Sequence, residues 1–173
     1  LPTKYNGKTI SYALVEENVP DGYAQEEDSN PQTVTNVRSG EIKDVVFYKD
    51  WDDSNNAAGY RPEQNEFAKK LTLTRSTTNG ASVRVDAQPT ITGTVTDHWT
   101  ISYGTLPQYN AQGQRYTYKL TEGAIDNYTV IGSNEIGVGE TITNKLNVGT
   151  LKITKQVAGV AATTDVFTIV VTN

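Results

Sequence analysis

Short runs of alternating apolar and polar residues extend along most of the chain. Alternation of this kind places successive side chains on opposite faces and is typical of a half-buried β-strand. It predicts strands at 9–16, 43–51, 71–75, 82–86, 98–103, 115–122 and 141–146. Asparagine or aspartate followed by glycine, as in Asn6-Gly7 and Asp21-Gly22, favours turns between the runs. Only 62–70 allows a short helix, so the pattern predicts an all-β sandwich.

The chain also repeats itself. Three pairs of segments match: 11–16 with 117–122, 33–36 with 141–144, and 151–157 with 45–51. Their spacing is about 106 residues, a normal size for one β-sandwich module. We therefore expect sandwich modules in tandem: the C-terminal part of a module at 1–38, a complete module at 41–146, and the N-terminal part of another at 148–173. The joints between them are short, which predicts a semi-rigid rod.

Composition narrows the chemistry that this sandwich can perform. The 173 residues carry a net charge of -5, which excludes the positive surface that nucleic acid requires. No apolar run reaches the length of about 18 residues that suits a membrane span. Cysteine is absent and His98 is the only histidine, so disulfides, thiolate chemistry and histidine-rich metal sites are excluded. We expect no metal, no cofactor and no multiple-turnover enzyme.

Three polar residues fall on the inner faces of predicted strands. Counting by two along each strand, Lys49 shares a face with Phe47 and Trp51, Glu122 with Tyr118 and Leu120, and Asn144 with Ile142 and Leu146. The partial modules carry the same residue types at matching positions, namely Glu16 and Asn36 in 1–38 and Lys155 in 148–173. This recurrence indicates that the inward polar residues have a role.

Burial of a lone ammonium or carboxylate is costly, so both groups are driven toward their neutral forms. A neutral amine is a nucleophile, and a protonated carboxyl is an acid. We therefore expect Lys49 to attack the side-chain carbonyl of Asn144, while Glu122 polarises that carbonyl and relays a proton to the departing ammonia. The product is an isopeptide bond. The alternative is a buried ion pair of Lys49 and Glu122 with Asn144 as a hydrogen-bond partner and no covalent chemistry.

Several ordered motifs together resemble the B-type repeat of the collagen-adhesin family. They are 47–53, Arg61-Pro62, 98–100, Leu106-Pro107, 116–122 and 142–144. The resemblance covers all of 41–146 and extends to 1–38 and 148–173 as truncated copies. It implies inverse immunoglobulin-like sandwiches with an autocatalytic isopeptide bond, in which Lys49, Asn144 and Glu122 hold the matching positions. It also implies a cell-wall-anchored surface adhesin or pilin of a Gram-positive bacterium, with the anchor outside this fragment.

These expectations lead to one functional hypothesis and one competitor. The hypothesis is a structural stalk module whose partners are neighbouring modules of the same protein, with host extracellular matrix contacted through the parent protein. The competitor is an adhesive module that itself binds a matrix ligand through loops such as 55–64 or 77–88.

Two further patterns leave alternatives open. Residues 50–56 superficially resemble a calcium loop, but a polar turn is favoured because the glycine and the final glutamate of such a loop are missing. We call residues 1–38 the head and residues 148–173 the tail. Lys155 in the tail, with Glu16 and Asn36 in the head, would allow the two ends to complement each other as donor strands do, within or between chains, although simple truncation is favoured.

Overall fold

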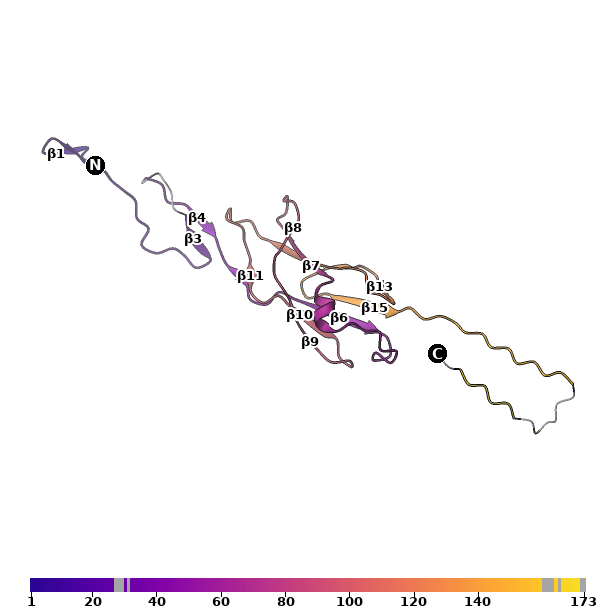
Figure 1. Ribbon diagram of the computed structural model, residues 1–173. Helices are drawn as coiled ribbons and strands as arrows, with labels where there is room; N and C mark the ends of the chain where they lie inside the picture. The colour runs from indigo at the N-terminus through magenta and orange to yellow at the C-terminus, as the bar shows by residue number, and fades with distance from the viewer. Residues whose placement is uncertain (27–29, 31, 160–163, 165, 172–173) are drawn as a thin grey trace.

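The computed structural model describes residues 1–26, 30, 32–159, 164 and 166–171. Figure 1 shows an elongated chain with a β-sandwich in its middle, the N-terminal segment on one side of it and the C-terminal segment on the other. Ahead of the sandwich lie four short strands: β1 (Lys4–Tyr5), β2 (Lys8–Thr9), β3 (Tyr23–Gln25) and β4 (Asn36–Arg38). No helix among the described residues has the length and apolar character needed to cross a membrane.

The sandwich begins at residue 41 and ends at residue 146. Its elements in chain order are β5 (Glu41–Ile42), β6 (Val46–Asp52), α1 (Gln64–Ala68), β7 (Leu71–Ser76), β8 (Val83–Arg84), β9 (Thr90–Thr92), β10 (Trp99–Ser102), β11 (Leu106–Pro107), β12 (Thr117–Glu122), β13 (Tyr128–Ile131), β14 (Glu135–Gly137) and β15 (Thr141–Leu146). The prediction of an all-β, immunoglobulin-like sandwich is confirmed, with one short helix inside the stretch 62–70.

Two sheets form the layers of the sandwich. One has the strand order β13-β15-β6-β10-β9, and the other has the order β14-β12-β7-β8. All pairings within these two sheets are antiparallel except that of β6 with β15, which is parallel. The first long strand of the sandwich therefore lies beside its last strand and points the same way.

Side chains that point inward from both sheets form the core, as the alternation predicts. The fully or nearly fully buried apolar members are Val45, Phe47, Phe67, Leu71, Leu73, Trp99, Ile101, Tyr103, Tyr118, Leu120, Tyr128, Ile136 and Ile142. Phe67 enters this core from α1, which explains why a five-residue helix persists between two strands. A helix this short owes its stability to packing rather than to intrinsic propensity.

Two predictions of local structure are wrong. Residues 10–16 form no strand, because a strand needs neighbours to satisfy its backbone and none of the described segments pairs with them. Conversely, several short strands were not predicted, namely β1, β3, β4, β5, β9, β11, β13 and β14. These strands are only two to four residues long, and a run of that length is too short to show alternation clearly.

Candidate isopeptide site

The fold brings Lys49, Glu122 and Asn144 together in the core. Lys49 lies on β6, and Asn144 lies on the adjacent parallel strand β15. The register pairs Ile142 with Lys49, so Asn144 is two residues further along and its side chain points to the same face. Glu122 enters from β12 in the facing sheet. Their exposed fractions are 0%, 1% and 2% for Lys49, Asn144 and Glu122 respectively.

Glu122 contacts both of the other residues. Its Oε1 accepts a 2.6 Å hydrogen bond from Asn144 Nδ2, and its Oε2 lies 3.7 Å from Lys49 Nζ. Lys49 Nζ also donates to the backbone oxygens of Asp50, at 2.9 Å, and Ile142, at 3.5 Å. The carboxyl group is therefore placed to exchange protons with the amine on one side and the amide on the other.

Two buried oxygens at this site accept no hydrogen bond from the described residues, namely Glu122 Oε2 and Asn144 Oδ1. An unsatisfied buried oxygen is costly, and its presence calls for a reason. A half-turn of the Asn144 amide would exchange its nitrogen and oxygen, and a protonated Glu122 would then donate to Oδ1. Such an arrangement would polarise the carbonyl.

Burial drives the two charged groups toward neutrality. It lowers the pKa of Lys49 to about 8, although the charges of Glu122 and Asp50 oppose this shift. It also raises the pKa of Glu122, against the effects of the Lys49 charge and the hydrogen bond from Asn144. Aromatic rings surround the amine: Nζ lies 4.1 Å from the ring centroid of Trp51 and 5.9 Å from that of Phe67. Both shifts favour the uncharged forms of the two groups.

A second buried polar group lies next to this site. Asp53 accepts hydrogen bonds from Arg61 through both carboxylate oxygens, with Nε at 3.0 Å and Nη2 at 2.5 Å. It also accepts from the hydroxyl of Tyr128 at 2.9 Å and from the backbone amide of Asn56 at 2.9 Å. Burial acts to raise the pKa of Asp53, but these hydrogen bonds, led by those of Arg61, hold that pKa below its usual range.

Sequence reasoning missed this group. It treated Asp53 as part of a polar turn and used Arg61 only as part of the Arg61-Pro62 motif. The turn itself is present: Ser54, Asn55 and Asn56 all have positive φ. The only available signal was an arginine close after a run of acidic residues, and such a pattern does not distinguish a buried pair from an exposed one.

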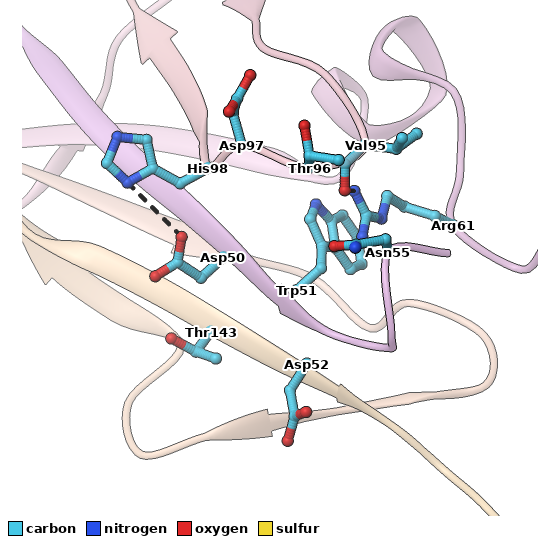
Figure 2. A pocket seen from close by; sticks show the side chains of 10 residues that line it. All are labelled: Asp50, Trp51, Asp52, Asn55, Arg61, Val95, Thr96, Asp97, His98 and Thr143. Carbon is cyan, nitrogen blue, oxygen red and sulfur yellow. Dashed lines mark hydrogen bonds and ion pairs between the residues drawn. The ribbon is translucent and has the colours of Figure 1, made fainter. Parts of the chain in front are cut away.

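A shallow hollow of about 310 Å³ opens beside the end of β6 (Figure 2). Asp50, Asp97 and His98 line it, and His98 Nδ1 lies 3.7 Å from Asp50 Oδ1. Both of those side chains are about half exposed, and the His98 ring packs against Tyr48. Among the described residues no group of three or more histidine, cysteine, aspartate or glutamate side chains is arranged to hold a metal ion.

Residues 1–38 and 148–173 contain contacts that resemble pieces of the site. Asn36 Nδ2 donates to Glu16 Oε1 at 3.0 Å, as Asn144 does to Glu122. In the tail, Lys155 Nζ lies 4.0 Å from the ring centroid of Phe167. The N-terminal segment, which carries Glu16 and Asn36, and the C-terminal segment, which carries Lys155, lie on opposite sides of the sandwich (Figure 1).

One further contact recurs at the repeat spacing. The Tyr12 hydroxyl donates to the backbone oxygen of Pro2 at 2.8 Å, and the Tyr118 hydroxyl donates to that of Pro107 at 2.7 Å. The head therefore repeats local contacts of the sandwich, although it forms fewer strands.

Comparison with known proteins decides the family. The model of the Cna protein B-type domain matches residues 45–145, which run from the residue before β6 to the penultimate residue of β15. The chain belongs to the Cna protein B-type domain family. A B-type domain is a structural module, in keeping with a site that lies inside the core rather than in an open cleft.

A curated relative of this B-type chain is a collagen adhesin of Staphylococcus aureus. It is 32% identical over 151 residues, which cover 83% of this chain and 11% of the adhesin. The chain therefore spans about a tenth of the length of that relative. No solved structure matches the chain.

Proposed function

We propose that this chain is part of the stalk of a Gram-positive cell-surface adhesin or pilin, and that a Lys49–Asn144 isopeptide bond rigidifies it. One observation carries the proposal: Glu122 lies between an amine and a carboxamide in a core from which water is excluded. An unreacted ion pair of this kind is at best weakly stabilising, and it gives no reason for an amide at the third position.

The reaction needs no external reagent. Neutral Lys49 Nζ attacks Cγ of Asn144 while Glu122 gives its proton to Oδ1, forming a tetrahedral intermediate. Glu122 then takes a proton from the attacking nitrogen and passes it to the amide nitrogen. That nitrogen leaves as ammonia while the carbonyl re-forms and Oδ1 returns its proton to Glu122. One C–N bond forms and one breaks, and Glu122 ends the cycle protonated as it began. The bond consumes both partners, so the reaction occurs once.

Intact mass tests this chemistry. We expect the purified chain to be lighter than its sequence by one ammonia, and a peptide map to show Lys49 joined to Asn144. A wild-type chain of full mass would leave the buried ion pair as the correct description and refute the proposal.

The placement of the bond suits a load-bearing module. Lys49 is on the first long strand and Asn144 on the last, and these strands are parallel neighbours. A pull on the two ends of the module would pass through the covalent bond and bypass the hydrogen bonds of both sheets. In a single-molecule pulling experiment we expect residues 49–144 to resist extension, while the segments outside them extend.

We also propose that the chain holds one complete B-type module, at 41–146, together with the end of a preceding module at 1–38 and the start of a following module at 148–173. The repeated contacts of Glu16 with Asn36 and of Tyr12 with Pro2 support this division. The joint at residue 40 is anchored, because Gln108 N donates to Gly40 O at 2.8 Å and β5 pairs with β11. Expression of 41–146 alone should give a folded domain.

The name of the relative supports a role in adhesion for the parent protein, for which we propose an extracellular, cell-wall-anchored location. Within that parent, we propose that neighbouring modules are the partners of this chain and that contact with host matrix belongs to other parts. Binding of the isolated chain to collagen, lost on substitution within 55–64 or 77–88, would instead favour a directly adhesive module.

A further inference from the structure

We propose that Arg61, held in place by Asp53 and Tyr128, is a positioning residue for the reaction of Lys49 with Asn144. This inference rests on the proposed function and adds to it a residue that touches neither reacting atom. The three side chains are called the clasp below.

The clasp joins the strands that carry the reacting groups. Asp53 directly follows β6, the strand of Lys49, and Tyr128 begins β13. β13 pairs along its whole length with β15, and its Val130 lies opposite Asn144. The hydrogen bond from Tyr128 to Asp53 therefore spans β15 and holds the end of β6 in register with the strand that carries the amide.

Arg61 adds a contact to the ring that covers the amine. Its Cζ lies 5.4 Å from the ring centroid of Trp51, and Lys49 Nζ lies 4.1 Å from the same ring. Trp51 is in turn opposite Asn144 in the parallel ladder. Nη1 of Arg61 donates to the backbone oxygen of Val95 at 3.1 Å, so the guanidinium is fixed from several sides (Figure 2).

The charges that face Lys49 can be named. Glu122 faces it from β12, Asp50 is its neighbour on β6, and Arg61 approaches from the turn that follows β6. The groups that face it from β10, α1 and β15 are the uncharged Trp99, Phe67 and Asn144. Of these three charged groups Arg61 is the positive one, and a guanidinium keeps its charge at all relevant pH values. Its charge disfavours a second positive charge on Nζ and so favours the neutral amine that attacks Asn144.

The amine and the carboxyl share one proton in the reactive state. The rate of bond formation should therefore follow a bell-shaped pH profile, falling at low pH when both groups are protonated and at high pH when neither is. Removal of a nearby positive charge makes both groups hold their protons more tightly. Loss of Arg61 should move both limbs of the bell to higher pH, which loss of packing alone would not do.

The experiment follows ammonia loss in the full chain. Chain isolated in urea before it folds is diluted into buffers between about pH 5 and about pH 10. Samples are quenched in acid and read by intact mass, and circular dichroism confirms folding. The variants are Arg61→Met, Arg61→Lys and Tyr128→Phe. Arg75→Met is the matched control, because Arg75 also lies over an aromatic ring, that of Tyr116, but in the other sheet.

On the acid limb of the profile we expect Arg61→Met to react about threefold more slowly, the effect of a shift of about half a pKa unit, with both limbs at higher pH. Arg61→Lys should keep the limbs of the wild type at a reduced rate. Tyr128→Phe should slow the reaction several-fold with its limbs unmoved, and Arg75→Met should match the wild type.

Three results would overturn the inference. The first is a folded Arg61→Met chain with the wild-type rate and pH profile. The second is a folded Arg61→Met chain that loses ammonia more slowly but whose pH profile has both limbs at the wild-type pH. The third applies if Arg61→Met fails to fold: a Tyr128→Phe chain that reacts at the wild-type rate would show that the clasp does not position the reaction. A wild-type chain that keeps its ammonia refutes the proposed function itself and is recognised by that result.

Discussion

The same pair of side chains occurs in two places in this molecule with very different surroundings. In the sandwich, Asn144 donates to Glu122 inside a sealed core, and Lys49 lies on the other side of the carboxyl. In the head, Asn36 donates to Glu16 in the same way, but Asn36 is exposed and no lysine of the described residues lies beside them. The hydrogen bond therefore requires only local spacing and a short turn of chain.

The proposed chemistry requires more than that hydrogen bond. Burial between two sheets shifts the pKa values of Lys49 and Glu122 toward neutrality, and only the sandwich supplies a second sheet. Two sites with the same residue types thus differ because one is enclosed and the other is open. Paired substitutions, one in each region, test this difference.

The largest expected effect is on bond formation itself. Glu122→Ala removes the group that moves protons between amine and amide, so we expect ammonia loss to be abolished. The matched substitution Glu16→Ala should not affect the reaction, so this variant should still be lighter than its sequence by one ammonia. Intact mass measures both. Ammonia loss in Glu122→Ala would show that burial of Lys49 and Asn144 alone is sufficient.

The next effect is on stability. Lys49→Met prevents closure of a loop of about 100 residues, which by analogy with disulfides lowers the free energy of unfolding by about 4–5 kcal/mol. Lys155→Met lies in the tail and should change it by less than about 0.5 kcal/mol. Guanidinium unfolding of both chains measures the difference. Equal midpoints for Lys49→Met and the wild type would mean that no bond constrains the sandwich.

The third effect is on the stability of the sandwich in acid, which should depend on Asp53. The pKa of Asp53 is held low in the folded chain, so its ionised form favours folding. That contribution is complete above the ordinary aspartate pKa of about 3.9 and is lost as the pH falls through the lower folded-state pKa. Asp53→Asn should therefore be less stable than the wild type at neutral pH, and its stability should fall less steeply below about pH 4. Unfolding midpoints across this range decide the matter, and parallel curves would contradict it.

The smallest effect concerns the repeated tyrosine. The Tyr118 hydroxyl donates to Pro107 in the sandwich, and the Tyr12 hydroxyl donates to Pro2 in the head. Tyr118→Phe should lower the stability of the sandwich by about 1 kcal/mol, the net value of one hydrogen bond. Tyr12→Phe should leave it unchanged, because the head lies outside the cooperative unit. An equal effect of both would show that head and sandwich unfold together, and thermal denaturation measures both.

Much of the fold followed from alternation. The long strands β6, β7, β12 and β15 were predicted to within a few residues, since each has six or seven residues with one face in the core. The segment 10–16 shows the limit of that reasoning. Its pattern is that of a strand, but strand formation depends on a neighbour that alternation within one segment does not report.

The candidate site was also predicted only in part. Lys49, Glu122 and Asn144 were found because each is a polar residue at an inward position, and this exception is visible in the sequence. Asp53 and Arg61 were missed because they lie in and after a turn, where no periodicity marks the inward side. Their burial depends on Tyr128 and on the segment before β10, which are distant in the sequence.

The sequence by itself therefore determined the strand pattern, the repeat, the B-type resemblance and the three inward polar residues, because all of these depend on local spacing. The tertiary structure decided which of those residues meet and in what surroundings. The parallel register of β6 and β15 places Asn144 on the face of Lys49, and the opposite sheet brings Glu122 between them. The pKa values of these groups depend on that enclosure, because removal of water is a property of the packed whole and not of any one segment.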